Sequence, residues 1–152
     1  MRGALSSPSP PPAPFLPNSS RGSVTGRAAK YSALRMKAAV GLDSDYFCRG
    51  VVGETAARCD RFEKQWRMPK AVYERLRVEL IKEPYFDETK RDAAGYPSCF
   101  TDQKMCAALV QLVEGVSSRA VWNYLKIVTS TAREALKKFS RAVVKHFKAE
   151  YL

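Results

Sequence analysis

The chain has 152 residues, of which 45% are hydrophobic and 27% are charged, a composition typical of a single globular domain. Lys and Arg together number 26 against 15 Asp and Glu, so the formal net charge is +11 and the surface is expected to attract polyanions, nucleic acid first among them. No stretch approaches the roughly 20 apolar residues that a bilayer-spanning helix needs, so the sequence predicts no membrane span.

The first part of the chain differs in composition from the rest. Residues 1–42 carry six basic residues and no acidic one, and six prolines fall between Pro8 and Pro17. Such a segment buries too little apolar surface to offset the entropy of ordering it, so we expect disorder over residues 1–42 and a folded domain over residues 43–152. The lack of acidic residues is also typical of organellar transit peptides, which stays open as an alternative to a plain basic tail.

Helical periodicity begins after Met68. Pro69 suits the first turn of a helix, because its missing N–H leaves no backbone donor unpaired there. An apolar stripe follows at helical spacing and consists of Val72, Tyr73, Leu76 and Leu80. The sequence therefore predicts an amphipathic helix that ends before Pro84, and a loop over residues 84–100, where prolines and a glycine interrupt any period.

The next two predicted helices lie on either side of Gly115. Residues 102–114 form the first, with an apolar face of Met105, Leu109, Leu112 and Val113. Gly115 is suited to a left-handed C-terminal cap. Residues 118–125 form a short second helix that Ser117 can cap, and residues 126–129 connect it to the last helix.

The last predicted helix is long and strongly amphipathic. Thr131 and Glu134 fit the capping-box pattern at its start. Its apolar face consists of Ala132, Leu136, Phe139, Val143 and Phe147. A helix, a glycine-containing turn, a short helix, a short turn and a long helix follow one another over residues 102–148, which is the order of a helix-turn-helix DNA-binding unit.

Basic residues recur every four positions on this last helix. Arg133, Lys137, Arg141 and Lys145 form one row opposite the apolar face, with Lys138 and Lys148 beside it. Ser130 and Thr131 offer hydroxyls and backbone N–H groups at the positive end of the helix dipole. We expect base-edge contacts from Arg133 and Lys137 and phosphate contacts from Lys138, Arg141 and Lys145. The alternative is a basic helix face that is merely solvated.

Other candidate sites are weaker. The four cysteines have no CxxC spacing and the chain has one histidine, so we expect reduced thiols in an intracellular protein and no metal site. We expect His146 to make a dipole contact or to pack, and Trp66, Trp122, Tyr124 and Phe139 to belong to the core. The carboxylates Asp43, Asp45, Asp87, Glu88 and Asp92 lie in turn-like regions without a supporting motif. GxSxG, P-loop, GxGxxG and HExxH patterns are absent, so the sequence predicts no cofactor and no catalytic residue.

Several strings together resemble a known family. They include DYF at 45–47, FEKQWRMPKAVYERL around Trp66 and PYFDETKRDAAG at 84–95, and the pattern continues through YLKI, ST and LKKF to EYL at the C-terminus. Over residues 43–152 the chain resembles the N-terminal region of PIF/Harbinger-type transposases, the plant-transposon-protein group. The resemblance implies a helix-turn-helix-like region followed by an RNase H-like nuclease domain with metal-binding carboxylates. No acidic residue here matches that catalytic triad.

The sequence thus predicts an all-α domain of four to five helices with a helix-turn-helix unit at about residues 102–148. The resemblance implies a DNA-binding portion truncated before its nuclease, which is not an enzyme as it stands, and which binds double-stranded DNA in the nucleus through Ser130, Thr131, Arg133 and the basic row. An organellar location applies if residues 1–42 are a transit peptide. Two alternatives stay open: a helical module that contacts a separate Myb-like DNA-binding protein or the missing nuclease domain, and a transposon remnant without function.

Overall fold

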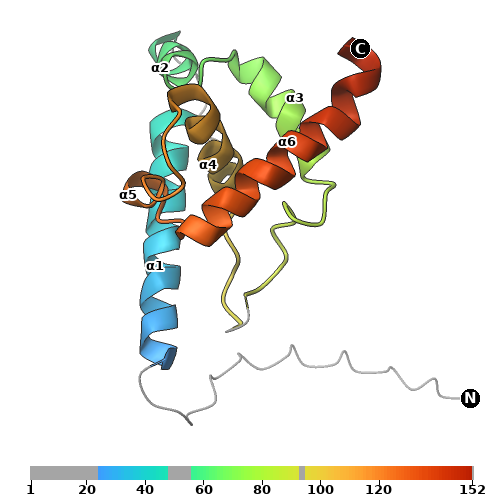
Figure 1. Ribbon diagram of the computed structural model, residues 1–152. Helices are drawn as coiled ribbons and strands as arrows, with labels where there is room; N and C mark the ends of the chain where they lie inside the picture. The colour runs from blue at the N-terminus through green and yellow to red at the C-terminus, as the bar shows by residue number, and fades with distance from the viewer. Residues whose placement is uncertain (1–23, 48–55, 93–94, 152) are drawn as a thin grey trace, which may run out of the picture.

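The computed structural model is all-α, as predicted, and it describes residues 24–47, 56–92 and 95–151 (Figure 1). Six α-helices and a short π-helix lie in these ranges, and the only β pairing there is a single bridge between Arg91 and Pro97. The elements are α1 (Val24–Leu42), η1 (Asp43–Phe47), α2 (Ala56–Trp66), α3 (Lys70–Leu80), α4 (Thr101–Glu114), α5 (Trp122–Leu125) and α6 (Thr129–Tyr151). None of the described helices is long and apolar enough to span a bilayer.

The prediction of disorder over residues 1–42 is wrong for residues 24–42, which form helix α1 and continue directly into η1. Among its described side chains only Ser32 and Leu42 are buried, so α1 has no wide apolar stripe that periodicity would reveal. Its alanines favour a helix, and tertiary contacts hold it. Arg35 pairs with Asp92 at 2.9 Å, and the Arg35 carbonyl accepts a 2.9 Å hydrogen bond from Gln103. The prediction for residues 1–23 lies outside the described residues.

Helix α2 was not predicted, since we expected periodicity only after Met68. Its Phe62 and Trp66 are almost fully buried and lie one turn apart. Phe62 packs in an aromatic cluster with Phe47 of η1 and Tyr73 of α3, with ring centroids 5.0 to 5.5 Å apart. This cluster brings the first half of the chain onto the second.

Helix α3 begins at Lys70, with Pro69 as its N-cap and not in its first turn as predicted, and it ends at Leu80, before Pro84 as the sequence predicts. Tyr73 and Leu80 are buried, but Val72 is 47% exposed, so its place in the apolar stripe was wrong. The buried face of α3 is narrow because the helix lies at the edge of the bundle. The predicted loop that follows is irregular, and its Phe86 is fully buried and anchors it to the core.

Helix α4 is the central helix of the fold (Figure 1). It begins at Thr101 and ends at Glu114, and Gly115 has the predicted left-handed conformation with φ of 63°. Neighbours α1, α2, α3 and α6 bury it on most sides, including the polar side chains of Gln103, Lys104 and Gln111. Leu112, predicted to face the core, is 55% exposed, because the open side of α4 falls at this position.

Helices α5 and α6 differ from the prediction at their starts. Helix α5 is a single turn whose N-cap is Val121 without a side-chain cap, so the predicted helix 118–125 capped by Ser117 is wrong. Helix α6 begins at Thr129, where Ala132 N–H bonds the Val128 carbonyl, so Thr131 lies inside the helix and is not its cap. The core-facing side of α6 consists of Ala132, Ala135, Phe139 and Ala142, with Leu136, Val143 and Phe147 half-buried.

Candidate nucleic-acid interface

Small residues let α6 approach α4 closely. Ala132, Ala135 and Ala142 are buried on α6, which packs against α4 in the most extensive helix pair of the described residues (Figure 1). The buried Gln111 of α4 donates a 3.0 Å hydrogen bond to the Ala132 carbonyl and accepts one of 2.6 Å from the Ser118 hydroxyl. One side chain therefore fixes both the start of α6 and the turn before α5.

Gln103, near the start of α4, also joins several elements through its side-chain amide. Its amide nitrogen donates to the carbonyls of Arg35 and Leu125, and its oxygen accepts a 3.2 Å hydrogen bond from Phe100 N–H. It thus connects α1, α4 and α5. Neither glutamine was predicted to have a structural role; their only signal in the sequence is an uncharged polar residue within an otherwise apolar helix, where a buried amide must find partners.

The predicted basic row lies on the solvent side of α6. Exposed side chains there are Ser130, Arg133, Lys137, Lys138, Arg141, Lys145 and Lys148. They lie opposite the alanines that contact α4, as the helical spacing requires. Within the described part of the chain Arg133, Lys137, Lys138, Arg141 and Lys148 form no ion pair. These cations are therefore not held by a direct contact with a described carboxylate, although Glu134 lies one turn before Lys138 on the same helix.

The first turn of α6 contains Ser130 and Thr131, as expected. Ser130 is exposed, whereas Thr131 is half-buried and its carbonyl accepts a 3.2 Å hydrogen bond from the Tyr85 hydroxyl. The first N–H groups of a helix have no partner within the helix, so this end carries a partial positive charge. Ser130 with Arg133 one turn later forms the accessible end of the row.

The C-terminal half of α6 is fixed to α3 by charged contacts. Glu83, just after α3, lies 2.6 Å from Lys145 Nζ and 2.7 Å from His146 Nε2, and these two partners lower the pKa of its carboxyl. His146, half-buried, also approaches Glu79 at 3.5 Å. Arg75 of α3 pairs with Glu150 at the end of α6. The predicted phosphate contact Lys145 is therefore already paired within the protein.

The other candidates have structural surroundings. Trp66 and Phe139 are core residues, as predicted, but Tyr124 is 47% exposed and donates a 2.9 Å hydrogen bond to Asp45. Trp122 is half-buried against Tyr31. Asp87 accepts hydrogen bonds from Thr89. The described residues contain no group of three or more His, Cys, Asp or Glu arranged for a metal.

Two of the four cysteines can be placed. Cys99 and Cys106 are buried thiols, and burial raises the pKa of the Cys99 thiol. The side chains of Cys48 and Cys59 lie outside the described residues.

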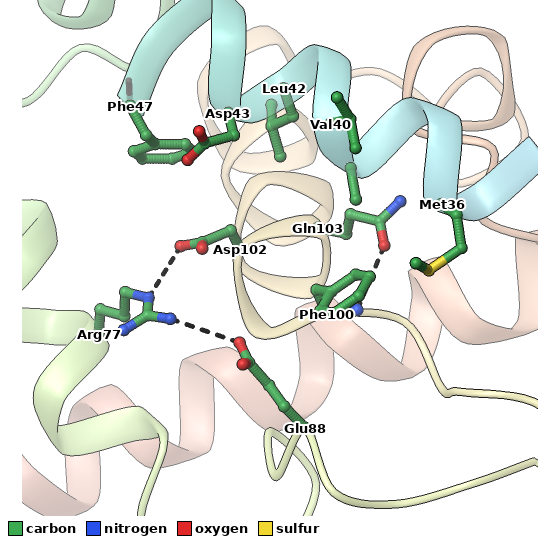
Figure 2. Close-up of a pocket in the computed structure, with 11 residues that line it drawn as sticks. Met36, Val40, Leu42, Asp43, Phe47, Arg77, Glu88, Phe100, Asp102 and Gln103 are labelled. Carbon is green, nitrogen blue, oxygen red and sulfur yellow. Dashed lines mark hydrogen bonds and ion pairs between the residues drawn. The ribbon is translucent and has the colours of Figure 1, made fainter. Parts of the chain in front are cut away.

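Of four cavities of about 240 to 380 Å³ among the described residues, the largest lies between α1, α3 and the start of α4 (Figure 2). Met36 and Val40 of α1 form an apolar wall, and Arg77 of α3 lies across from them (Figure 2). The Arg77 guanidinium bridges two carboxylates, at 3.1 Å from Asp102 and 3.4 Å from Glu88. The cavity therefore has an apolar side and a charged side in which the arginine is neutralised.

The chain matches no protein-family model, no curated protein and no solved structure.

Proposed function

We propose that α4, α5 and α6 form a helix-turn-helix unit that binds duplex DNA through α6, and that the chain is the DNA-binding portion of a PIF/Harbinger-like transposase acting in the nucleus. The observation that carries the proposal is the exposed row of cations on α6. Four cations of this face, Arg133, Lys137, Lys138 and Arg141, are exposed and form no ion pair within the described residues. Exposed cations along one helix face can track a phosphate backbone.

Salt dependence of binding tests this proposal. If about four to six phosphates are neutralised, log K for a duplex falls against log salt with a slope of about −4 to −5. Fluorescence anisotropy of a labelled duplex measures the slope. No binding at low ionic strength, or a flat salt response, would reject DNA binding.

A charge-matched pair of variants separates the row from the net charge of the chain. One variant replaces Arg133, Lys137, Lys138 and Arg141 with Gln. The control replaces the exposed lysines Lys30, Lys37, Lys64 and Lys90, on other elements, with Gln. Both lose four charges, but only the first removes the proposed contact surface. Equal losses of affinity in the two variants would mean that binding depends on overall charge alone.

A second candidate function is a protein-interaction module for a separate Myb-like DNA-binding protein, as the resemblance implies. It is favoured by Met36 and Val40, which are 41% and 68% exposed beside the largest cavity. Apolar side chains exposed next to a cavity are typical of a surface that another protein covers. The salt titration of the purified chain separates the two functions, because an interaction module alone does not bind the duplex.

A further inference from the structure

A groove of about 280 Å³ separates α6 from the segment that follows α3. Three cations line one wall on successive turns of α6, namely Arg141 and Lys145 of the row and Lys138 beside it. The opposite wall is formed by residues 83–86, which include Pro84, Tyr85 and Phe86. The groove therefore lies along the flank of the proposed DNA-binding helix.

The wall opposite α6 is held in place by a hydrogen bond within the segment and by hydrogen bonds to two helices, α6 and α4. Phe86 N–H bonds the Glu83 carbonyl at 2.9 Å, and the Phe86 side chain is fully buried. The Tyr85 hydroxyl bonds Thr131 of α6, and the Tyr85 carbonyl accepts a 2.8 Å hydrogen bond from Lys104 of α4. A wall tied to α6 and α4 in this way is ordered before any ligand arrives, which lowers the entropic cost of binding.

The charges of the groove differ between its two ends. Lys138 and Arg141 are exposed and have no ion pair within the described residues. At the other end the Glu83 carboxylate contacts both Lys145 and His146. Glu83 is the one carboxylate that lines the groove in the described part of the chain. One end of the groove is therefore cationic and open to an anion. At the other end the cations already contact the Glu83 carboxylate.

We propose that this groove seats one backbone phosphate of duplex DNA between Lys138 and Arg141, and that Glu83 keeps Lys145 out of the contact. The inference rests on the proposed function and refines it, because the sequence extended the phosphate contacts of α6 as far as Lys145. A phosphate at Lys145 would have to displace a carboxylate with two donors or lie beside its negative charge. Of the three cations that line the groove, only Lys138 and Arg141 therefore contact the DNA.

Single-charge variants test the inference through the salt slope of duplex binding. Lys138→Gln and Arg141→Gln should each reduce the slope by about one, because each removes one phosphate contact. Lys145→Gln should leave it unchanged, although it removes the same charge from the same helix. If neither the unaltered chain nor any of these variants binds duplex, the proposed function fails. If duplex binds but Lys145→Gln loses as much as Arg141→Gln, only the present inference fails.

Removing Glu83 gives the reverse test. Glu83→Gln should free Lys145 and steepen the slope by about one, and adding Lys145→Gln to that variant should cancel the gain. An unchanged slope in a folded Glu83→Gln protein would overturn the role of Glu83. Thermal unfolding checks that the variant folds, since it also loses the contact with His146; if it does not fold, the comparison of Lys145→Gln with Arg141→Gln decides.

Inorganic phosphate distinguishes a free anion from a backbone phosphate. At constant ionic strength, Lys138→Gln and Arg141→Gln should weaken duplex binding whether the buffer anion is chloride or phosphate, because the backbone phosphate is held together with its linked neighbours. Variants that lose inorganic phosphate binding but keep the duplex affinity of the unaltered chain would overturn the assignment to the DNA backbone.

Discussion

The hydroxyl of Tyr73 on α3 donates a 2.8 Å hydrogen bond to the carboxylate of Asp102 on α4, across 29 positions of the chain. Arg77 Nε donates to the same carboxylate oxygen at 3.1 Å. Tyr73 is fully buried, and burial, followed by the nearby Cys106 and Asp102, raises its pKa well above the usual value. This contact joins the helix that holds Glu79 and Arg75 to the helix on which α6 packs.

Replacing Tyr73 with Phe should destabilise the fold by about 1.5 to 3 kcal/mol, because it removes a buried hydrogen bond to a charged acceptor while keeping the aromatic ring. Urea unfolding measures the change. Tyr46→Phe is the matched control, since the Tyr46 hydroxyl is half-buried and its partners are the uncharged Gln65, at 3.5 Å, and Tyr124. A loss from Tyr46→Phe as large as that from Tyr73→Phe would contradict the role assigned to the Tyr73 hydroxyl.

Gly115 should resist substitution because of its backbone and not because of its neighbours. A Cβ at this position meets nothing within 4 Å, but φ is 63°, so Gly115→Ala should cost about 1 to 2 kcal/mol. Gly41 in α1 has equally open surroundings without a positive φ, so Gly41→Ala should stabilise by about 0.5 to 1 kcal/mol. Thermal unfolding should therefore show opposite shifts in Tm; shifts of the same sign would exclude this explanation.

The sequence predicts those helices whose buried face is regular. Helices α3, α4 and most of α6 follow from apolar spacing, and Gly115 follows from the need for a left-handed cap. Helix α1 was missed because only Ser32 and Leu42 of its described side chains are buried. Its stability depends on contacts such as Arg35 with Asp92, 57 positions away, which no local pattern contains.

The basic row could be predicted only in part. The exposure of Arg133, Lys137 and Arg141 follows from a helix whose opposite face is apolar, and the structure confirms that exposure. The pairing of Lys145 with Glu83 could not be predicted, because the two residues are 62 positions apart and meet only through the packing of α3 against α6. DNA contact by the row stays a proposal.

Acid should weaken the attachment of α6 to α3. The pKa values of Glu79, Glu83 and Glu150 are lowered from the ordinary 4.5, chiefly by hydrogen bonds from Lys82, Lys145 and Arg75 respectively. A carboxyl whose folded pKa is depressed contributes stability above its unfolded pKa and loses it as the pH falls through the folded value. Tm should therefore decrease as the pH falls below about 4.5, the ordinary pKa of a glutamate carboxyl.

The triple variant with Gln at positions 79, 83 and 150 tests the cause of this acid dependence. Its Tm should change less with pH than that of the unaltered chain over the same interval. Because these groups are exposed, added salt should also reduce the difference between the two proteins. Identical pH profiles would mean that other carboxylates dominate the acid response.

Arg133 and Arg141 should differ in the kind of binding that they provide. Arg133 lies in the first turns of α6, beside the exposed Ser130, where only the start of a recognition helix reaches base edges in the major groove. Its planar guanidinium can bond a guanine edge, so Arg133→Ala should cost about 1 to 3 kcal/mol and relax preference at one base pair.

Arg141, two turns later, lines the groove together with Pro84 and should contact the DNA backbone alone. Arg141→Ala should weaken all duplexes alike and lower the salt slope by about one. Selection from a randomised duplex pool, followed by salt titration of the selected and a scrambled duplex, measures both effects. Equal and sequence-independent losses at the two positions would show that α6 contacts only the phosphate backbone of the DNA and does not read base edges in the major groove.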